Sequence, residues 1–195
     1  TASDINDVGE KYYKERNIPF VSIDITRKDD FKQLDKFNFD VIIHLAAHQP
    51  ANVSQKNYDP NDYIKVNVLG TLNVLAYCSS CKVERIIYAS SHRNTQGLWK
   101  GTNAIKESEG RAIKYDTEYT MFSISESAAQ DCVTYYSAQH HLKSIIFRLP
   151  PVYGYGPHTE IFKDGKPIKT GFQIFIDKAM ACQQLEVWGD SSRGR

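Results

Sequence analysis

Apolar residues recur along this chain in two alternating patterns, one of strand length and one of helix length. Short apolar runs predict strands over residues 19–24, 40–47, 85–90, 144–149 and 185–188. Segments with apolar residues three and four positions apart predict helices over 29–37, 60–81, 122–139 and 171–183. This alternation predicts an α/β fold with right-handed crossovers, in which helices cover a parallel sheet.

Individual segments refine this picture. The run from Asp40 to Ala47 is almost continuously apolar, which is typical of a strand buried on both faces. Asp59 and Pro60 mark a helix start, with an N-cap followed by proline at the first helical position. The helix after them is expected to pack through one apolar face, formed by Ile64, Val68, Leu72 and Leu75. The polar stretch from His92 to Tyr115 is expected to be a long surface loop.

Composition excludes several classes of protein. A chain of 195 residues, 41% hydrophobic and 24% charged, is typical of a folded globular protein with one domain or slightly more. The 24 Lys and Arg nearly balance the 23 Asp and Glu, which argues against a protein that binds nucleic acid by neutralising phosphates. No apolar run approaches the ~18 residues of a membrane helix. Residues 1–17 are polar and acidic, unlike a secretion signal or a transit peptide.

The four cysteines are too few for a disulfide-stapled secreted domain, so we expect reduced thiols and a cytoplasmic location. The pair Cys78 and Cys81 has the spacing of a redox motif. Such motifs lie at a helix N-terminus, where the helix dipole stabilises the thiolate, whereas this pair is expected at a helix end. His44 and His48 have a spacing used by metal sites in helices, but a strand followed by a loop would separate them, so we expect no metal site.

In a sheet of this kind, ligands bind beyond the carboxyl ends of the strands. The segments after Asp24, Ala47, Ser91 and Leu149 are therefore where chemistry is expected. Small side chains at a strand end let a flat cofactor approach the backbone. Gly70 lies inside a helix at a cost of ~1 kcal/mol relative to alanine, so we expect a close contact between this helix and the sheet.

Six motifs in order resemble the extended short-chain dehydrogenase/reductase superfamily, and within it the NAD-dependent sugar-nucleotide epimerases and dehydratases. They span residues from about 18 to 195. In chain order they are Val21-Ser22-Ile23-Asp24-Ile25, His44-Leu45-Ala46-Ala47, the helix from Asp59-Pro60 through Asn67-Val68-Leu69-Gly70-Thr71-Leu72-Asn73, Tyr88-Ala89-Ser90-Ser91, Phe147-Arg148-Leu149-Pro150-Pro151-Val152-Tyr153-Gly154 and Val187-Trp188-Gly189-Asp190.

The resemblance implies a Rossmann-like, doubly wound parallel sheet. Residues 1–150 would form a partial dinucleotide-binding domain, and residues 151–195 would begin the substrate lobe. Two parts of the family fold have no match: the N-terminal glycine-rich strand-turn-helix that seats the pyrophosphate, and the rest of the C-terminal substrate lobe. Because the missing strand is central in the family, we expect a hole in the middle of the sheet.

The resemblance also implies ligands and partners. NAD is the expected cofactor, with NADP left open, and its expected contacts are Asp24, Ile25, Leu45, Ala46, Ala47, Asn67, Ser90, Glu126 and Pro150. The expected substrate is a nucleotide sugar, contacted by His48, His92, Pro151 and Tyr153. A homodimer through the helices around 60–80 and 122–140 is expected, with no nucleic-acid or membrane partner.

The catalytic helix departs from the family pattern. The family uses a tyrosine and, four residues later, a lysine; here Phe122 stands in the tyrosine position and Glu126 in the lysine position, while Ser91 keeps the serine position. Phenylalanine has no proton to transfer, and a carboxylate cannot lower the pKa of a phenol. Glu126 could still accept hydrogen bonds from ribose. Tyr119 and His92 are weaker candidates for proton transfer.

Three interpretations of function therefore stay open. The first is an NAD-dependent epimerase or dehydratase with an atypical active site, which the family role favours. The second is a catalytically degenerate module that binds a dinucleotide or a sugar nucleotide. The third, a thiol redox enzyme, rests only on Cys78 and Cys81.

Overall fold

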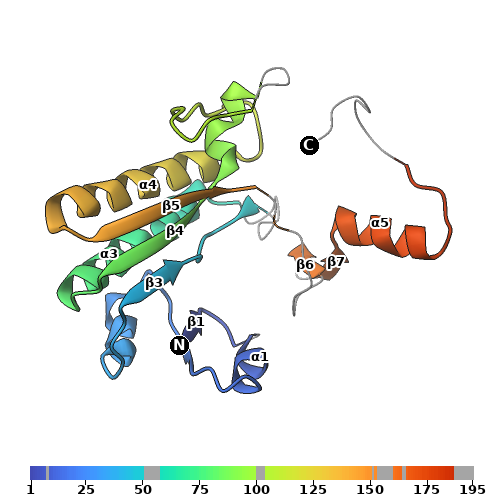
Figure 1. Ribbon diagram of the computed structural model, residues 1–195. Helices are drawn as coiled ribbons and strands as arrows, with labels where there is room; N and C mark the ends of the chain where they lie inside the picture. Colours follow the sequence, from blue (N-terminus) through green and yellow to red (C-terminus); the bar gives the residue numbers. More distant parts are fainter. Residues whose placement is uncertain are drawn as a thin grey trace.

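The described strands form three small sheets (Figure 1). The computed structural model describes residues 1–7, 9–50, 58–99, 104–150, 152, 160–163 and 166–186. The largest sheet is parallel and contains β3 (Val41–His44), β4 (Arg85–Ser91) and β5 (Lys143–Leu149) in that order. A second parallel pair joins β1 (Ala2–Asp4) to β2 (Phe20–Ser22), and an antiparallel pair joins β6 (Glu160–Lys163) to β7 (Lys166–Lys169). The parallel α/β architecture predicted from the sequence is confirmed.

Two helices cover one face of the larger sheet, as Figure 1 shows. They are α3 (Thr71–Ser80) and α4 (Thr120–His140), which pack against each other. Alternate strand residues such as Ile86 and Tyr88 are buried in the core. The core residues that α3 and α4 contribute include Val74, Leu75, Cys78, Ala129 and Val133.

The opposite face of this sheet is exposed. Val41, Ile43 and Phe147 leave 42%, 62% and 48% of their surface accessible. The prediction that the strand within Asp40–Ala47 is buried on both faces is therefore wrong for the described part of the chain. The apolar run from Asp40 to Ala47 alternates between a buried and an open face, because successive strand side chains point to opposite sides.

The helix that begins at Asp59 is confirmed, but its buried face is not the predicted one. Asp59 Oδ1 accepts a hydrogen bond of 2.9 Å from the backbone N–H of Asn61. The helix continues as α2 (Pro60–Tyr63), the π-helical segment η4 (Ile64–Gly70) and α3. The buried side chains here are Tyr63, Asn67, Thr71 and Val74, each one position before a predicted one, and they include polar residues that an apolar pattern does not count. Of the predicted face, Leu75 is fully buried, whereas Val68 and Leu72 are half-buried and Ile64 is exposed.

Several elements differ from their predicted form. The sequence pattern missed β1 and α1 (Glu10–Lys14), because three strand residues among polar neighbours give no periodic signal. The expected helix over 29–37 is the 3₁₀ helix η1 (Lys28–Leu34). The expected loop after His92 begins as the 3₁₀ helix η5 (His92–Leu98), which buries Asn94 and Thr95. The remaining differences lie near the C-terminal end: α5 (Gly171–Met180) is confirmed, β6 and β7 were not predicted, Leu185 and Glu186 lie outside any strand, and Val187 and Trp188 lie outside the described residues.

Candidate functional site

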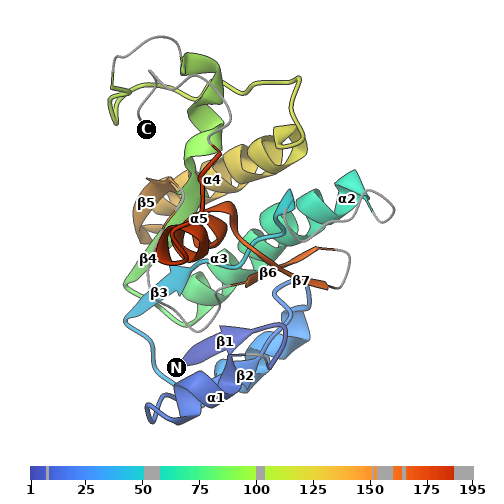
Figure 2. The same ribbon diagram turned by 90° about the vertical axis from the view of Figure 1, so that its right-hand side faces the viewer.

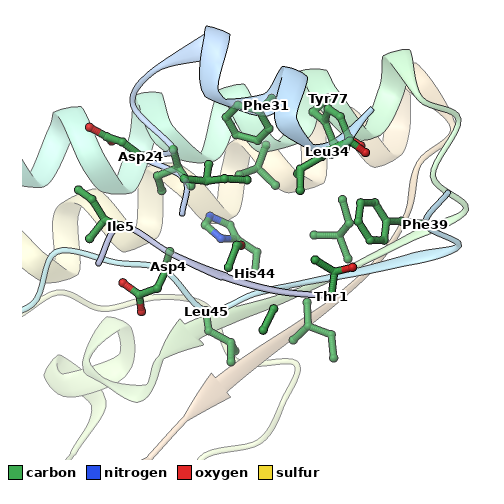
Figure 3. Close-up of a pocket in the computed structure, with 18 of the residues that line it drawn as sticks. Thr1, Asp4, Ile5, Asp24, Phe31, Leu34, Phe39, His44, Leu45 and Tyr77 are labelled. Atoms are coloured by element: carbon green, nitrogen blue, oxygen red, sulfur yellow. The ribbon is translucent and has the colours of Figure 1, made fainter. Parts of the chain in front are cut away.

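A cavity of about 790 Å³ lies between the two parallel sheets (Figure 3). Among the described strands, β1 pairs with β2 alone and β3 pairs with β4 on one side, and both β1 and β3 line the cavity. Figure 2 shows the pair β1 and β2 beside η1, apart from the three-stranded sheet. The interruption agrees with the hole expected in the middle of the sheet. The apolar walls of the cavity include Ile23, Phe31, Leu34, Phe39 and Ile42.

Two carboxylates line this cavity at the carboxyl ends of their strands. Asp4 ends β1, and Asp24 follows β2 (Figure 3). Asp24 Oδ1 accepts hydrogen bonds from the backbone N–H of Thr26 at 2.9 Å and from its hydroxyl at 2.7 Å, and Asp24 Oδ2 is 3.5 Å from Arg27 Nε. Burial raises the pKa of Asp24, but the Thr26 hydrogen bonds and the Arg27 charge outweigh it, so the pKa is lowered overall. The carboxylate is therefore charged at neutral pH.

Gly70 makes the close contact that its position in a helix predicted. A Cβ atom there would lie 2.7 Å from Ile25 Cδ1 and 2.8 Å from Ile25 Cγ1. The partner is the segment after β2, not a strand of the sheet. Asn73, one turn further along, donates a 2.9 Å hydrogen bond from its amide to the carbonyl of Ile25. The two contacts fix the Asp24–Ile25 wall against α3.

Asn67 ties the end of β3 to α4. Its side-chain amide donates to the His48 carbonyl at 3.1 Å and to the Ser125 hydroxyl at 2.9 Å, and its Oδ1 accepts from the His48 N–H at 2.6 Å. Asn67 is 1% exposed, so its carboxamide is used inside the protein. It holds the strand end after Leu45, where Leu45 and Ala46 are exposed and Ala47 is half-buried.

The ends of β4 and β5 bring the predicted serine and histidine together. Ser91 pairs in register with Leu149, and His92 Nδ1 lies 3.1 Å from the Leu149 carbonyl oxygen. Ser91 is 8% exposed and accepts a 3.1 Å hydrogen bond from the backbone N–H of Arg93, which caps η5. Pro150 comes directly after Leu149, the last residue of β5, and is exposed.

Ser90 points the other way from Ser91, toward the helices. It is 4% exposed, accepts a hydrogen bond from Asn94 at 3.0 Å and donates to Gln130 at 3.5 Å.

Phe122 and Glu126 both lie on the buried side of α4. The exposed fraction is 9% for Phe122 and 2% for Glu126. Glu126 Oε2 accepts a 2.9 Å hydrogen bond from the Tyr88 hydroxyl. Burial raises the pKa of Glu126 to about 7, because the charged form loses its hydration and this loss exceeds the effect of the Tyr88 bond. Burial, together with the Glu126 charge, also raises the pKa of Tyr88. The carboxyl group is therefore directed into the core.

The remaining candidates have separate surroundings. His44 is buried against the Thr71 hydroxyl at 2.9 Å, and burial lowers its pKa to about 4. The His48 ring packs edge-on against Tyr63, with ring centroids 4.7 Å apart. The two histidines thus have different partners. Pro151 and Tyr153 lie outside the described residues.

The cysteine pair is divided by burial. Cys78 is buried and Cys81 is exposed at the end of α3. Burial raises the pKa of Cys78 to about 12, which opposes formation of a thiolate and argues against a redox pair.

Sequence reasoning missed four residues that shape this edge: Asp4, Tyr88, Arg93 and Ser125. Asp4 ends a short strand, and dinucleotide-binding folds carry an acidic residue that bonds the ribose at such a strand end, so this rule could have suggested Asp4. The roles of Tyr88 and Ser125 follow only from the packing of α4 against the neighbouring elements.

Across the described residues, no helix combines the length and apolarity needed to cross a lipid bilayer.

Parallel strands with crossover helices packed on them, and polar side chains at their carboxyl ends, are typical of a Rossmann-like fold. The model of the NAD dependent epimerase/dehydratase family matches residues 3–195. The chain belongs to this family.

Relatives agree with this assignment. A putative UDP-glucose 4-epimerase of Methanocaldococcus jannaschii is 28% identical over 178 residues, which cover 90% of this chain and 53% of the relative. A UDP-glucuronate 4-epimerase of Thermodesulfobacterium geofontis is 26% identical over 200 residues, which cover 99% of this chain and 56% of the relative. Among solved structures, the UDP-glucuronic acid 4-epimerase of Bacillus cereus in complex with NAD superposes with a TM-score of 0.67 at 18% identity, covering 95% of this chain and 54% of that one. The chain thus spans about half the length of these relatives.

Proposed function

We propose that this protein is an NAD-dependent enzyme that acts on sugar nucleotides, of the epimerase or dehydratase type. One observation carries the proposal: three parallel strands end at a common edge that holds His48, Ser91 and His92. This is the edge where α/β folds bind ligands. The putative UDP-glucose 4-epimerase and the UDP-glucuronate 4-epimerase among the relatives support the substrate class.

The residues at the cavity fit one part of the cofactor. Asp24 is ionised and, with Asp4, supplies carboxylates that can accept hydrogen bonds from ribose hydroxyls or an adenine amino group. Leu45 and Ala46 are exposed, Ala47 is half-buried, and the two small alanines leave the backbone open to a flat ring. We propose Ile25 and Pro150 as further walls. No glycine-rich turn that could cradle the pyrophosphate occurs in the described part of the chain. The complex of the Bacillus cereus relative supports NAD as the cofactor.

Bound NAD would supply reversible acceptance of a hydride from the sugar. The chain's own contribution is to hold the sugar beside the Ser91 hydroxyl. We propose His48, His92, Pro151 and Tyr153 as substrate contacts. Ser91 uses its oxygen to accept from the Arg93 N–H, so its hydrogen is free to be donated to a substrate oxygen.

Proton transfer in this site lacks the family's tyrosine. Phe122 has no ionisable group, and Glu126 is held inside by Tyr88. For Glu126 to contact a ribose it would have to leave Tyr88. Asn67 would act on the cofactor through the His48 backbone that it holds. We propose His92, which follows Ser91 at the end of β4, as the group that transfers the proton.

A second function is favoured by the same substitution. A module that binds a dinucleotide or a sugar nucleotide without turnover needs the edge but neither the phenol nor the ammonium. For either function we propose a dinucleotide-binding part over residues 1–150, the start of a substrate lobe over 151–195, and a cytoplasmic homodimer. Exposed apolar side chains on the two candidate dimer helices, Leu69 and Tyr135, support the dimer.

Titration with NADH tests the cofactor half of the proposal. We expect NADH fluorescence to rise on binding, with a dissociation constant below about 1 mM. We expect Asp24→Ala to bind NADH more weakly. The matched control is Asp29→Ala, since Asp29 is exposed on η1. No change with NADH up to millimolar concentration contradicts the proposal. Conversion of UDP-glucose or UDP-glucuronate, followed by chromatography, separates an enzyme from a binding module.

A further inference from the structure

Arg93 is fixed beside the candidate serine. It is the second residue of η5, and its backbone N–H donates to Ser91 Oγ at 3.1 Å. Its position relative to the end of β4 is therefore set by the backbone and does not depend on the side-chain rotamer.

Two aromatic rings hold the Arg93 guanidinium. Its Cζ atom lies 3.9 Å from the centroid of the Tyr119 ring and 5.5 Å from that of Trp99. Tyr119 caps the start of α4, and Trp99 follows η5. Trp99 in turn stacks on His92, with centroids 5.1 Å apart and planes 12° from parallel. The cation is thus braced between the end of β4 and the start of α4.

No carboxylate neutralises this cation within the described residues. Arg16, Arg27, Arg85 and Arg111 each lie within 4.0 Å of an Asp or Glu oxygen, and Arg148 donates to the Glu109 carbonyl. Arg93 differs from all of them, because the partners of its side chain among the described residues are the rings of Trp99 and Tyr119. An aromatic ring attracts the face of a guanidinium but leaves its N–H edge to donate to an anion.

We propose that Arg93 binds a carboxylate on the sugar of the substrate, so that the preferred substrate class is a nucleotide-linked uronic acid. The inference rests on the proposed function. A planar guanidinium matches a carboxylate through two parallel hydrogen bonds. The Arg93 backbone is bonded to Ser91, beside which the sugar is proposed to lie, so we place the guanidinium at the sugar and not at the diphosphate. The two relatives described above differ in this feature, one being a UDP-glucose and the other a UDP-glucuronate epimerase.

Calorimetry on the protein with saturating NAD tests the inference with UDP-glucuronate and UDP-glucose, which share the diphosphate and differ at the carboxylate. We expect UDP-glucuronate to bind about tenfold or more tightly, because hydrogen bonds to charged groups are the stronger ones. Arg93→Gln is expected to abolish this preference while leaving UDP-glucose within about twofold, and Arg93→Lys to retain part of it. Arg85→Gln, at the opposite end of β4, is the matched control and should keep the preference.

Each other outcome is decisive. Equal affinity of the wild type for the two sugar nucleotides overturns the inference. Equal weakening of both by Arg93→Gln means that Arg93 contacts the diphosphate, which also overturns it, as does no effect on either. Failure of both sugar nucleotides to bind overturns it together with the proposed substrate class. The NADH titration, measured separately, shows whether the cofactor half of the proposed function survives. Circular dichroism checks that each variant is folded.

Discussion

The buried carboxyl group of Glu126 makes the stability of this protein depend on pH. In the folded protein burial raises the pKa of Glu126 from 4.5 to about 7. Below pH 4.5 the group is protonated in both folded and unfolded chains and imposes no charge on the core. As the pH rises toward 7 the unfolded chain ionises first, so stability is lost, and above 7 the folded protein must bury the charge. Glu126→Gln removes the titration and keeps an oxygen that can accept from Tyr88.

The size of the effect follows from the two pKa values. They differ by about 2.5, and a difference of one corresponds to about 1.4 kcal/mol, which gives about 3 kcal/mol over the whole range. Between pH 5 and pH 8 part of this range is used. We therefore expect the stability of Glu126→Gln relative to wild type to increase by about 2 to 3 kcal/mol from pH 5 to pH 8.

Urea denaturation followed by circular dichroism at pH 5, 6, 7 and 8 measures this difference. The comparison of variant with wild type cancels the other titrating groups, which are common to both proteins. Glu107→Gln, an exposed glutamate substitution, is the control and should show a difference that does not change with pH. A Glu126→Gln difference that is also independent of pH, or that grows toward acid, would refute the reasoning, because it would mean that Glu126 is ionised in the folded core or reaches solvent.

Three further substitutions test the contacts around the site. Gly70→Ala gains ~1 kcal/mol of helix propensity, but its Cβ overlaps Ile25, so we expect a net loss of about 1 kcal/mol of unfolding free energy in urea denaturation. An added Ile25→Ala should offset this loss, and additive effects of the two substitutions would contradict the contact. Asn67→Ala removes three hydrogen bonds, so we expect a loss of about 2 to 3 kcal/mol and faster hydrogen exchange at the His48 amide, and unchanged exchange would argue against this link. Glu126→Lys introduces the family's residue and buries an ammonium beside Tyr88, so we expect thermal denaturation to show a loss of about 3 to 5 kcal/mol of unfolding free energy, with or without Phe122→Tyr. A melting temperature equal to that of wild type would show that the lysine side chain reaches solvent.

Local signals in the sequence predicted most of the framework. The Asp59–Pro60 helix start, the strand that ends at Ser91 and the long helix containing Glu126 were each predicted, because caps and apolar periodicity act within a few residues. The short strand β1 escaped because three residues carry too little pattern. The buried face of the helix after Asp59 was misjudged because it contains Asn67 and Thr71, which an apolar pattern does not count.

For the candidate site, strand ends could be predicted from the sequence, but side-chain contacts could not. Apolar runs indicated which residues end the parallel strands, and the family motifs predicted roles for Ser91, Phe122 and Glu126 that stay predictions. The packing of distant elements was needed to show that Glu126 bonds Tyr88 in the core and that the Asn67 amide bonds the His48 backbone. It was also needed to show that one face of the three-stranded sheet is exposed. The physical reason is that a side chain's environment depends on which distant elements pack around it. Periodicity along the chain records the faces of an element, but not what meets them.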